Sequence, residues 1–208
     1  MRGLFITFEG IEGCGKSTQV KLLAEWLRAT GREVLLTREP GGPVISEEIR
    51  RVLLNPDTPE MLPETELLLY MASRSQHTGE LIIPALESGQ DVISDRYYDS
   101  TIAYQGAARN IDLEWIKRLT DYATYSLKPD ITFLLDISVE ESTRRLTERC
   151  LDRIEKEKCD FHQKVREGFL TLANSEPERF KVLDGTAPID VISIAIINET
   201  EKYMKRGL

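Results

Sequence analysis

Residues 10–17 read Gly10-Ile11-Glu12-Gly13-Cys14-Gly15-Lys16-Ser17 and match the pattern G-x-x-x-x-G-K-[ST] at every fixed position. Glycines let backbone N–H groups turn inward on phosphate oxygens, the lysine reaches the β- and γ-phosphates, and the hydroxyl holds magnesium. The stretch predicts a nucleotide phosphate-binding loop. Its candidate binding residues are Gly10, Ile11, Glu12, Gly13, Cys14, Gly15, Lys16, Ser17 and Thr18.

The flanks of this loop have the patterns of a strand and a helix. Residues 4–8 form a short β-prone run before it, and Val20, Leu23 and Leu27 repeat at i, i+3 and i+7 after it. Gly31 supplies a stop for that helix, and the N–H groups at the helix N-terminus would point at bound phosphate. The order strand, loop, helix favours phosphate binding over a plain glycine turn between two core elements.

The rest of the chain alternates short strands with helices. Strands are predicted at residues 34–37, 91–94, 131–136 and 180–184, and helices at 47–54, 64–88, 113–126, 140–149, 160–174 and about 189–205. Strands separated by helices predict an α/β fold with a parallel sheet covered on both faces. In such a sheet the ligand crevice lies at the carboxyl ends of the strands.

Composition limits the possible organisation and partners. The chain has 208 residues and no Pro/Gly/Ser-rich linker, which predicts one domain over residues 1–208. Its formal net charge of -8 argues against non-specific binding to nucleic acid, whose affinity is dominated by phosphate charge. No apolar stretch approaches the roughly 18 residues of a membrane span. Three cysteines without a disulfide-framework spacing indicate free thiols in the cytoplasm.

A second informative stretch runs from residue 91 to residue 97. It is a hydrophobic strand that ends in an acid, Asp95, at the edge where the phosphate-binding loop is expected. Asp95 is the natural partner of Ser17 around magnesium, directly or through water. Arg96 follows and can face the transferred phosphoryl group or the acceptor phosphate. The alternative for Asp95 is an acid that caps the following turn.

Arginines are spread along the chain in the pattern of a phosphate clamp. If the helix after residue 140 continues, Arg145, Arg149 and Arg153 fall at successive i+4 positions on one face, and could approach one polyphosphate. The charged segment 151–159 joins two helices on the carboxyl-end side, where a mobile lid would sit. The competing interpretation is a solvated charged face. The full set of candidates is Arg38, Arg74, Arg96, Arg144, Arg145, Arg149 and Arg153.

Three other chemistries are disfavoured by the motifs. Guanine-specific switch proteins usually carry Asn-Lys-x-Asp after a late strand, whereas residues 127–130 read Leu-Lys-Pro-Asp and precede a strand. The two histidines, His77 and His162, offer no nucleophile-base-acid constellation. Cys150, Cys159 and His162 superficially suit zinc, but a fourth ligand is not evident.

Four stretches of the chain together resemble the thymidylate kinases, which transfer the γ-phosphate of ATP to dTMP. They are the loop with its flanks at 8–18, Thr-Arg-Glu-Pro-Gly-Gly at 37–42, Asp-Arg-Tyr-Tyr-Asp-Ser with Ala-Tyr-Gln-Gly within 95–106, and Leu-Asp-Arg-Ile-Glu at 151–155. The resemblance covers essentially the whole chain. It implies a P-loop nucleoside-monophosphate-kinase-like three-layer sandwich, with a five-stranded parallel sheet and helices on both faces. It further implies ATP and dTMP as substrates, Mg²⁺ and a homodimer.

The same resemblance implies roles for the acceptor residues. It places Arg38 and Arg96 near the 5′-phosphate of dTMP, Arg74 near the thymine carbonyl, and Tyr70 stacked on the base. Tyr104 would crowd the sugar C2′ position, and Glu12 would contact the 3′-hydroxyl. The implied acceptor set is Glu12, Arg38, Tyr70, Arg74, Arg96, Ser100, Thr101, Tyr104 and Gln105, with Ser100 and Thr101 at the base edge.

Members of this family place a catalytic arginine either in the phosphate-binding loop or in the lid. The loop here has no arginine, so the lid at about 149–159 would supply it, as in bacterial-type members. The implied catalytic set is Lys16, Arg96, Arg149 and Arg153. Pro43 departs from the family, in which a threonine usually follows the two glycines.

Two other functions stay open at this point. One is kinase activity toward another nucleotide, deoxynucleotide or deoxynucleoside, and the other is a nucleotide-dependent switch or binding protein. Cys14, at a helix N-terminus where a thiolate is stabilised, leads us to expect that its alkylation blocks ATP binding.

Overall fold

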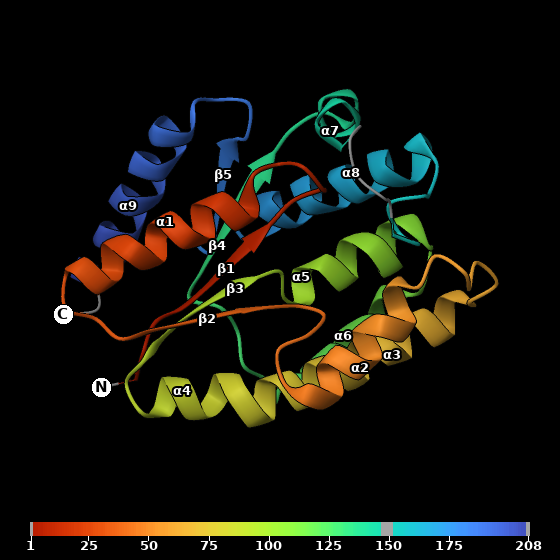
Figure 1. Ribbon diagram of the computed structural model, residues 1–208, viewed down its shortest axis with the longest axis horizontal. Helices are drawn as coiled ribbons and strands as arrows, with labels where there is room; N and C mark the ends of the chain where they lie inside the picture. The colour runs from red at the N-terminus through yellow and green to blue at the C-terminus, as the bar shows by residue number, and fades with distance from the viewer. Residues whose placement is uncertain (1, 147–151, 207–208) are drawn as a thin grey trace.

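The fold is built on a five-stranded parallel sheet. The computed structural model describes residues 2–146 and 152–206. Its strands are β1 (Phe5–Glu9), β2 (Val34–Arg38), β3 (Asp91–Asp95), β4 (Ile131–Asp136) and β5 (Phe180–Asp184), in the order β2-β3-β1-β4-β5 (Figure 1). Every neighbouring pair is parallel, so the predicted sheet is confirmed.

Helices connect the strands and cover the sheet. They are α1 (Lys16–Ala29), α2 (Val44–Leu54), α3 (Pro63–His77), α4 (Ile83–Glu87), α5 (Tyr98–Thr101), α6 (Leu113–Ala123), α7 (Val139–Leu146), α8 (Cys159–Ser175) and α9 (Ile189–Arg206). Two further stretches are π-helical, η1 (Thr78–Ile82) and η2 (Ile102–Ala108). Figure 1 shows α1 and α9 side by side. None of the described helices is long and apolar enough to cross a membrane.

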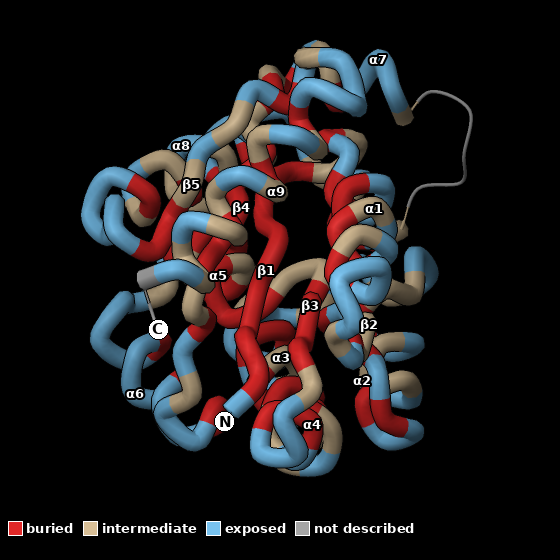
Figure 2. Tube along the Cα trace, turned by 90° about the vertical axis from the view of Figure 1, so that its left-hand side faces the viewer, coloured by how far each residue is buried: buried red, intermediate tan, exposed pale blue. Residues whose placement is uncertain are grey.

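The central strand β1 packs helices on both of its faces. All five of its residues are buried, and Figure 2 shows β1 and β3 as buried strands in the middle of the molecule. Phe5 belongs to a cluster with Ile82 and Leu86 around α4, whereas the next residue, Ile6, belongs to the cluster that contains Leu23 of α1. Successive strand side chains point to opposite faces, so this alternation places α4 and α1 on opposite sides of the sheet.

The helix α1 begins directly after the phosphate-binding loop without a side-chain cap. Gly15 precedes it with φ 98°, in the left-handed region, and no side chain accepts a hydrogen bond from the first turn. The Thr18 N–H donates to the Gly15 carbonyl at 3.2 Å, whereas N–H groups nearer the helix start have no side-chain cap from Gly15 and can meet an anion. Gly31 follows the helix with φ 84°, which confirms the predicted stop.

The helical boundaries differ from the prediction in three places. The helix expected at 64–88 is interrupted by η1. The helix expected at 113–126 ends at Ala123, and Tyr125 and Ser126 then adopt positive φ values of 54° and 58°. Residues 98–108, which we did not predict to be helical, form α5 and η2.

The arginine-lined helix after β4 also differs from expectation. In the described residues α7 ends at Leu146, and Arg153 lies in a turn before α8. The condition for Arg153 to share one helix face with Arg145, a helix that continues to residue 153, is therefore not met. Arg149 and Cys150 lie outside the described residues.

A matched pair of glycine substitutions tests the close approach of the loop to the sheet. A Cβ at Gly10 would lie 2.5 Å from the Leu135 carbonyl oxygen, whereas one at Gly31 would meet nothing within 4 Å. Both residues have positive φ, which is unfavourable for alanine. In Gly31→Ala this conformational cost of about 1–2 kcal/mol is the only cost, because the added Cβ meets no neighbour. Gly10→Ala is expected to lose clearly more stability in urea unfolding. Equal losses for the two variants would contradict this packing.

Candidate active site

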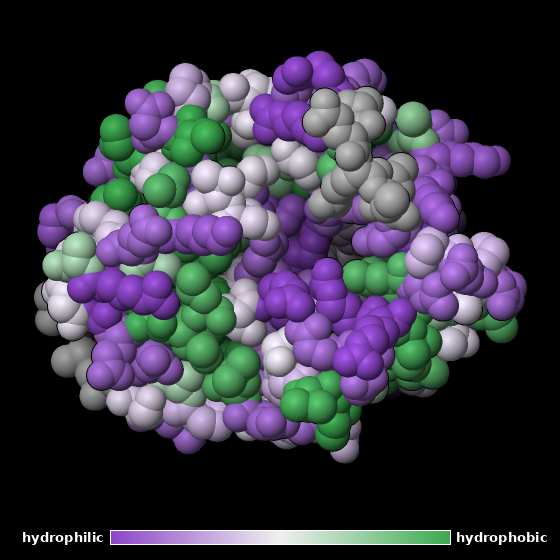
Figure 3. All heavy atoms as spheres, viewed as in Figure 1, coloured by the Kyte–Doolittle hydropathy of each residue, from purple (hydrophilic) through white to green (hydrophobic). Residues whose placement is uncertain are grey.

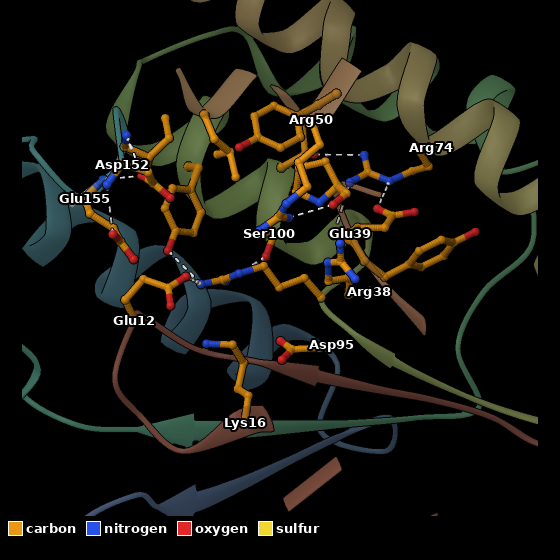
Figure 4. Close-up of a pocket in the computed structure, with 18 of the residues that line it drawn as sticks. Glu12, Lys16, Arg38, Glu39, Arg50, Arg74, Asp95, Ser100, Asp152 and Glu155 are labelled. Atoms are coloured by element: carbon orange, nitrogen blue, oxygen red, sulfur yellow. Dashed lines mark hydrogen bonds and ion pairs between the residues drawn. The ribbon is translucent and has the colours of Figure 1, made fainter. Parts of the chain in front are cut away.

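The loops after β1, β2 and β3 converge on one cavity at the carboxyl end of the sheet. The register places Phe8 of β1 and Arg38 of β2 on either side of Asp95 in β3. The cavity has a volume of about 450 Å³. In the space-filling view a hollow with hydrophilic walls opens near the middle of the molecule (Figure 3). Figure 4 shows Lys16 and Asp95 at one end of the cavity and Arg50 and Arg74 at the other.

The side chain of Lys16 packs against the phosphate-binding loop. Its Nζ donates to the carbonyls of Gly10 at 3.1 Å and Ile11 at 3.0 Å, and lies 3.5 Å from the Cys14 Sγ. The side chain is nearly buried yet lines the cavity. The ammonium is thus held beside the amides of the loop, where it would meet the phosphates of a bound nucleotide.

Ser17 and Asp95 meet at the same end of the cavity. The Ser17 hydroxyl donates to Asp95 Oδ2 at 2.7 Å, and both side chains line the cavity. A hydroxyl and a carboxylate next to a phosphate-binding loop fit Mg²⁺, which takes oxygen ligands and keeps several waters and substrate phosphates. In the described residues no group of three His, Cys, Asp or Glu side chains suits a metal, so an all-protein cage is not formed there.

Arg96 joins the two ends of the cavity. Its φ is 76°, an uncommon value for a non-glycine residue, of the kind that clusters at functional sites. The guanidinium donates to the Gly10 carbonyl at 2.9 Å and to Ser100 Oγ at 3.1 Å, and pairs with Glu12. Burial by itself lowers the Arg96 pKa, but the facing Tyr104 and the nearby acids outweigh it and hold the pKa well above its ordinary value.

Glu9 binds the backbone next to Arg96. Its buried carboxyl group accepts hydrogen bonds from the Tyr97 N–H at 2.8 Å and the Ser100 hydroxyl at 2.6 Å. Burial raises the Glu9 pKa to about 8, Asp99 adds to the rise, and Arg96 opposes it. Glu9 therefore holds a proton over much of the neutral range.

The far end of the cavity is organised around a fully buried arginine. Arg74 donates to Glu39 Oε2 at 2.8 Å, Thr101 Oγ1 at 2.8 Å and the Tyr97 carbonyl at 3.2 Å. The other Glu39 oxygen lies 3.0 Å from His77 Nδ1. Burial alone would raise the Glu39 pKa, but Arg74 and His77 outweigh it and lower the pKa.

The comparisons with known proteins agree with this geometry. The family model for thymidylate kinase matches residues 8–196 of the chain. The chain belongs to the thymidylate kinase family. It is 47% identical over 205 residues to the thymidylate kinase of Caldanaerobacter subterraneus, with 99% of this chain and 98% of that protein covered. It is 50% identical over 186 residues to that of Carboxydothermus hydrogenoformans, with 89% and 90% covered.

A solved structure extends the similarity to three dimensions. The crystal structure of thymidylate kinase from Ehrlichia chaffeensis matches with a TM-score of 0.79 and 35% sequence identity, covering 96% of this chain and 99% of that chain. This chain therefore has the P-loop kinase fold that its sequence predicts.

The structure brings the residues assigned to the acceptor by the family resemblance into one cavity. All of them line it: Glu12, Arg38, Tyr70, Arg74, Arg96, Ser100, Thr101, Tyr104 and Gln105. Burial raises the pKa of Tyr70 and of Tyr104, so both phenols stay neutral. Arg38 pairs with Glu47 in the first turn of α2, at 2.8 Å. The individual roles of the nine acceptor residues remain predictions.

Two predicted residues lie differently from what we expected. Arg153 is buried, donates to the Leu53 carbonyl at 2.9 Å and pairs with Glu66 at 2.7 Å, so its guanidinium is not brought to the cavity. Its role in transfer stays a prediction. Cys14 is 1% exposed, which argues against its ready alkylation in the folded protein.

Several cavity residues were missed by sequence reasoning. Arg50 of α2 lines the cavity and donates to the Pro40 carbonyl at 2.7 Å. Burial and then the nearby Arg38 lower the Arg50 pKa. Asp152 and Glu155 also line it, whereas the sequence predicts only a lid for their segment. An arginine within an ordinary amphipathic helix gives no local signal that its face meets a site.

The raised Glu9 pKa predicts a pH dependence of stability. Between pH 4.5, the ordinary value, and about 8, the unfolded chain loses the Glu9 proton while the folded chain keeps it. The folded state then binds more protons than the unfolded state, so the free energy of unfolding falls as pH rises through this window. In Glu9→Gln, which cannot titrate, urea unfolding is expected to show a smaller fall between pH 5 and pH 8. An unchanged fall would exclude the assignment.

Proposed function

We propose that this chain transfers the γ-phosphoryl group of ATP to the 5′-phosphate of dTMP, giving dTDP and ADP. The observation that carries the proposal is the position of Arg96. It lies between a phosphate-binding loop with Lys16 and an acceptor pocket with Tyr70 and Arg74, within one cavity. Donor and acceptor phosphates bound at the two ends would meet at this guanidinium.

The chemistry needs positioning and charge more than a general base. A phosphate monoester has a second pKa near 6, so the attacking oxygen is mostly ionised at neutral pH. The main obstacle is repulsion between two anions. Lys16 and Arg96 would offset this repulsion and align the groups. Mg²⁺, held by Ser17 and Asp95, would add positive charge at the donor phosphates when bound.

We carry the acceptor roles over from the family resemblance, and the shared cavity supports them. Arg38 and Arg96 would hold the 5′-phosphate, and Arg74, fixed by Glu39, would face the thymine carbonyl. Tyr70, one turn before Arg74, would stack on the base. Ser100, Thr101 and Gln105 would approach the base edge, Tyr104 would crowd C2′, and Glu12 would meet the 3′-hydroxyl.

We propose that residues 1–208 form a single kinase domain, with about 149–159 as its lid. Arg149, outside the described residues, is the proposed lid arginine at the transferred group. Arg145 is already close to the phosphate-binding loop, because it donates to the Gly13 carbonyl at 3.0 Å.

Acceptor-dependent ADP release tests the reaction and the acceptor together. With ATP and Mg²⁺ we expect strong stimulation by dTMP and little by dUMP, dCMP, dGMP, AMP or thymidine, and loss of the signal with EDTA. Lys16→Ala should lower turnover by orders of magnitude, while Lys21→Ala, exposed on the same helix, should not.

Each other outcome of this assay points to one alternative. Stimulation by another acceptor would keep a kinase and overturn the base assignment. No stimulation by any acceptor would favour a nucleotide-dependent switch or binding protein. Near-full activity of Lys16→Ala would overturn the role of the lysine.

We also propose that the protein is a cytoplasmic homodimer. The unpaired thiols Cys14 and Cys159 suit a reducing compartment. Large apolar side chains are exposed on α9 and on three helices that lie together, α2, α3 and α6, of which α3 contacts both others. Such exposed apolar surface marks interaction sites. The residues on α2, α3 and α6 include Ile45, Val52, Leu68, Trp115 and Tyr122.

A charged side chain introduced on this apolar surface should dissociate the dimer into monomers. Trp115 on α6 is 61% exposed and is the test position. Ile194 on α9 is 58% exposed and is the matched control. Sedimentation velocity is expected to give a dimer for the wild type and Ile194→Glu, and a monomer for Trp115→Glu. A monomeric wild type, or a dimeric Trp115→Glu, would contradict the proposed surface.

A further inference from the structure

A buried carboxylate outside the proposed reaction holds two arginines at once. Glu66 lies on α3, one turn before Tyr70, and its side chain has no exposed surface. One of its oxygens accepts a hydrogen bond from Gln105 at 2.8 Å. The other is paired with Arg109 at 3.1 Å and with Arg153 at 2.7 Å. The anion therefore sits between two guanidinium groups that come from distant parts of the chain.

Both arginines also reach the segment 152–158. Arg153 belongs to it and donates to the Leu53 carbonyl in the last turn of α2, where a cation complements the free carbonyls of the helix end. Arg109 follows η2 and pairs with Glu157 at 2.7 Å. Its guanidinium also lies 4.5 Å from the Phe161 ring at the start of α8. The segment is thus tied to Glu66 at two points, directly through Arg153 and by way of Arg109 through Glu157.

The segment held in this way is a wall of the cavity. Asp152, Ile154 and Glu155 line it, and Figure 4 shows Asp152 and Glu155 together at one side. Arg74, two turns after Glu66 on the same helix, lines the other side of the cavity (Figure 4). The helix that presents Tyr70 and Arg74 to the cavity therefore also fixes the wall that faces them.

The ionised state of Glu66 is consistent with this arrangement. Burial alone would raise its pKa, but Arg109, Gln105 and Arg153 outweigh burial and lower the pKa. A buried ion pair is a weak source of net stability, whereas removal of the anion leaves the buried cations uncompensated. The cluster of Glu66, Arg109 and Arg153 is therefore better suited to fixing the position of the segment 152–158 than to stabilising the fold.

We propose that Glu66 is a positioning residue that latches the segment 152–158 onto α3 and so completes the acceptor pocket. The proposal rests on the function proposed above in one respect only, the identity of the acceptor as dTMP. The latch itself consists of contacts within the protein and does not depend on which acceptor binds.

Glu66→Gln tests the latch because it keeps the shape and removes the charge. Without substrates, the amides of residues 153–157 are expected to exchange with deuterium about tenfold faster or more than in the wild type. With substrates, the KM for dTMP should rise about tenfold or more, with a smaller change in the KM for ATP. Glu66→Asp, which keeps the charge, should recover part of both effects.

Asp91→Asn is the matched control. Asp91 is also a buried carboxylate paired with an arginine, Arg32, but it lies at the start of β3, at the opposite end of the strand from the cavity. Its loss should lower stability while the exchange of residues 153–157 and the KM for dTMP stay at wild-type values. If Asp91→Asn changed them as much as Glu66→Gln does, the effect would be general loosening and the latch would be overturned.

The exchange measurement separates failure of the latch from failure of the proposed reaction. Wild-type exchange of residues 153–157 in Glu66→Gln would overturn the latch whether or not the chain phosphorylates dTMP. If Glu66→Gln does not fold, Arg153→Gln is used for the same exchange measurement, since it removes the direct tie and leaves Glu66 with Arg109 and Gln105. Unchanged exchange in that variant would also overturn the proposal.

Discussion

The site depends on the register between β1 and β3. Phe8 pairs with Asp95, so the phosphate-binding loop, which leaves β1 two residues later, begins beside the end of β3. The Arg96 N–H then donates to the Phe8 carbonyl at 2.9 Å, and Ser17 reaches Asp95 at 2.7 Å. A one-residue slip would turn every side chain of the strand to the other face. One backbone pairing thus places the Ser17 and Asp95 oxygens, the phosphate-binding loop and Arg96 together.

Within this frame, carboxylates position the arginines of the cavity. The chain carries a net charge of -8, yet Arg38, Arg74 and Arg96 each pair with an acid, namely Glu47, Glu39 and Glu12. Such pairing holds planar donor groups in fixed orientations before substrate arrives, which lowers the ordering cost of binding. The cavity therefore gathers Lys16 and four arginines as fixed donors, although as many carboxylates as cations line it.

The parts of this arrangement with local signals could be predicted from the sequence. The loop at 10–17, the five strands and the pairing of Ser17 with Asp95 follow from spacing, periodicity and the rule that parallel strands end at one edge. The π-helical η1 has no such signal, since it interrupts an otherwise helical pattern, and η2 lies in residues 98–108, for which no helix is predicted. Glu66, Arg109 and Arg153 are far apart in sequence, and nothing local indicates that burial brings their charges together. For the same reason the i+4 spacing of Arg145 and Arg153 could not show whether the helix continues to residue 153.

We propose that donor and acceptor phosphates meet at Arg96 in one cavity. Calorimetric titration with a linked compound, in which adenosine and thymidine are joined through their 5′ positions by a chain of phosphates, tests it most directly. If both ends are occupied at once, the linked compound should bind at least about a hundredfold more tightly than ADP or dTMP alone and should displace each of them. Affinity no higher than that of the better single ligand, or displacement of only one of them, would contradict a shared cavity.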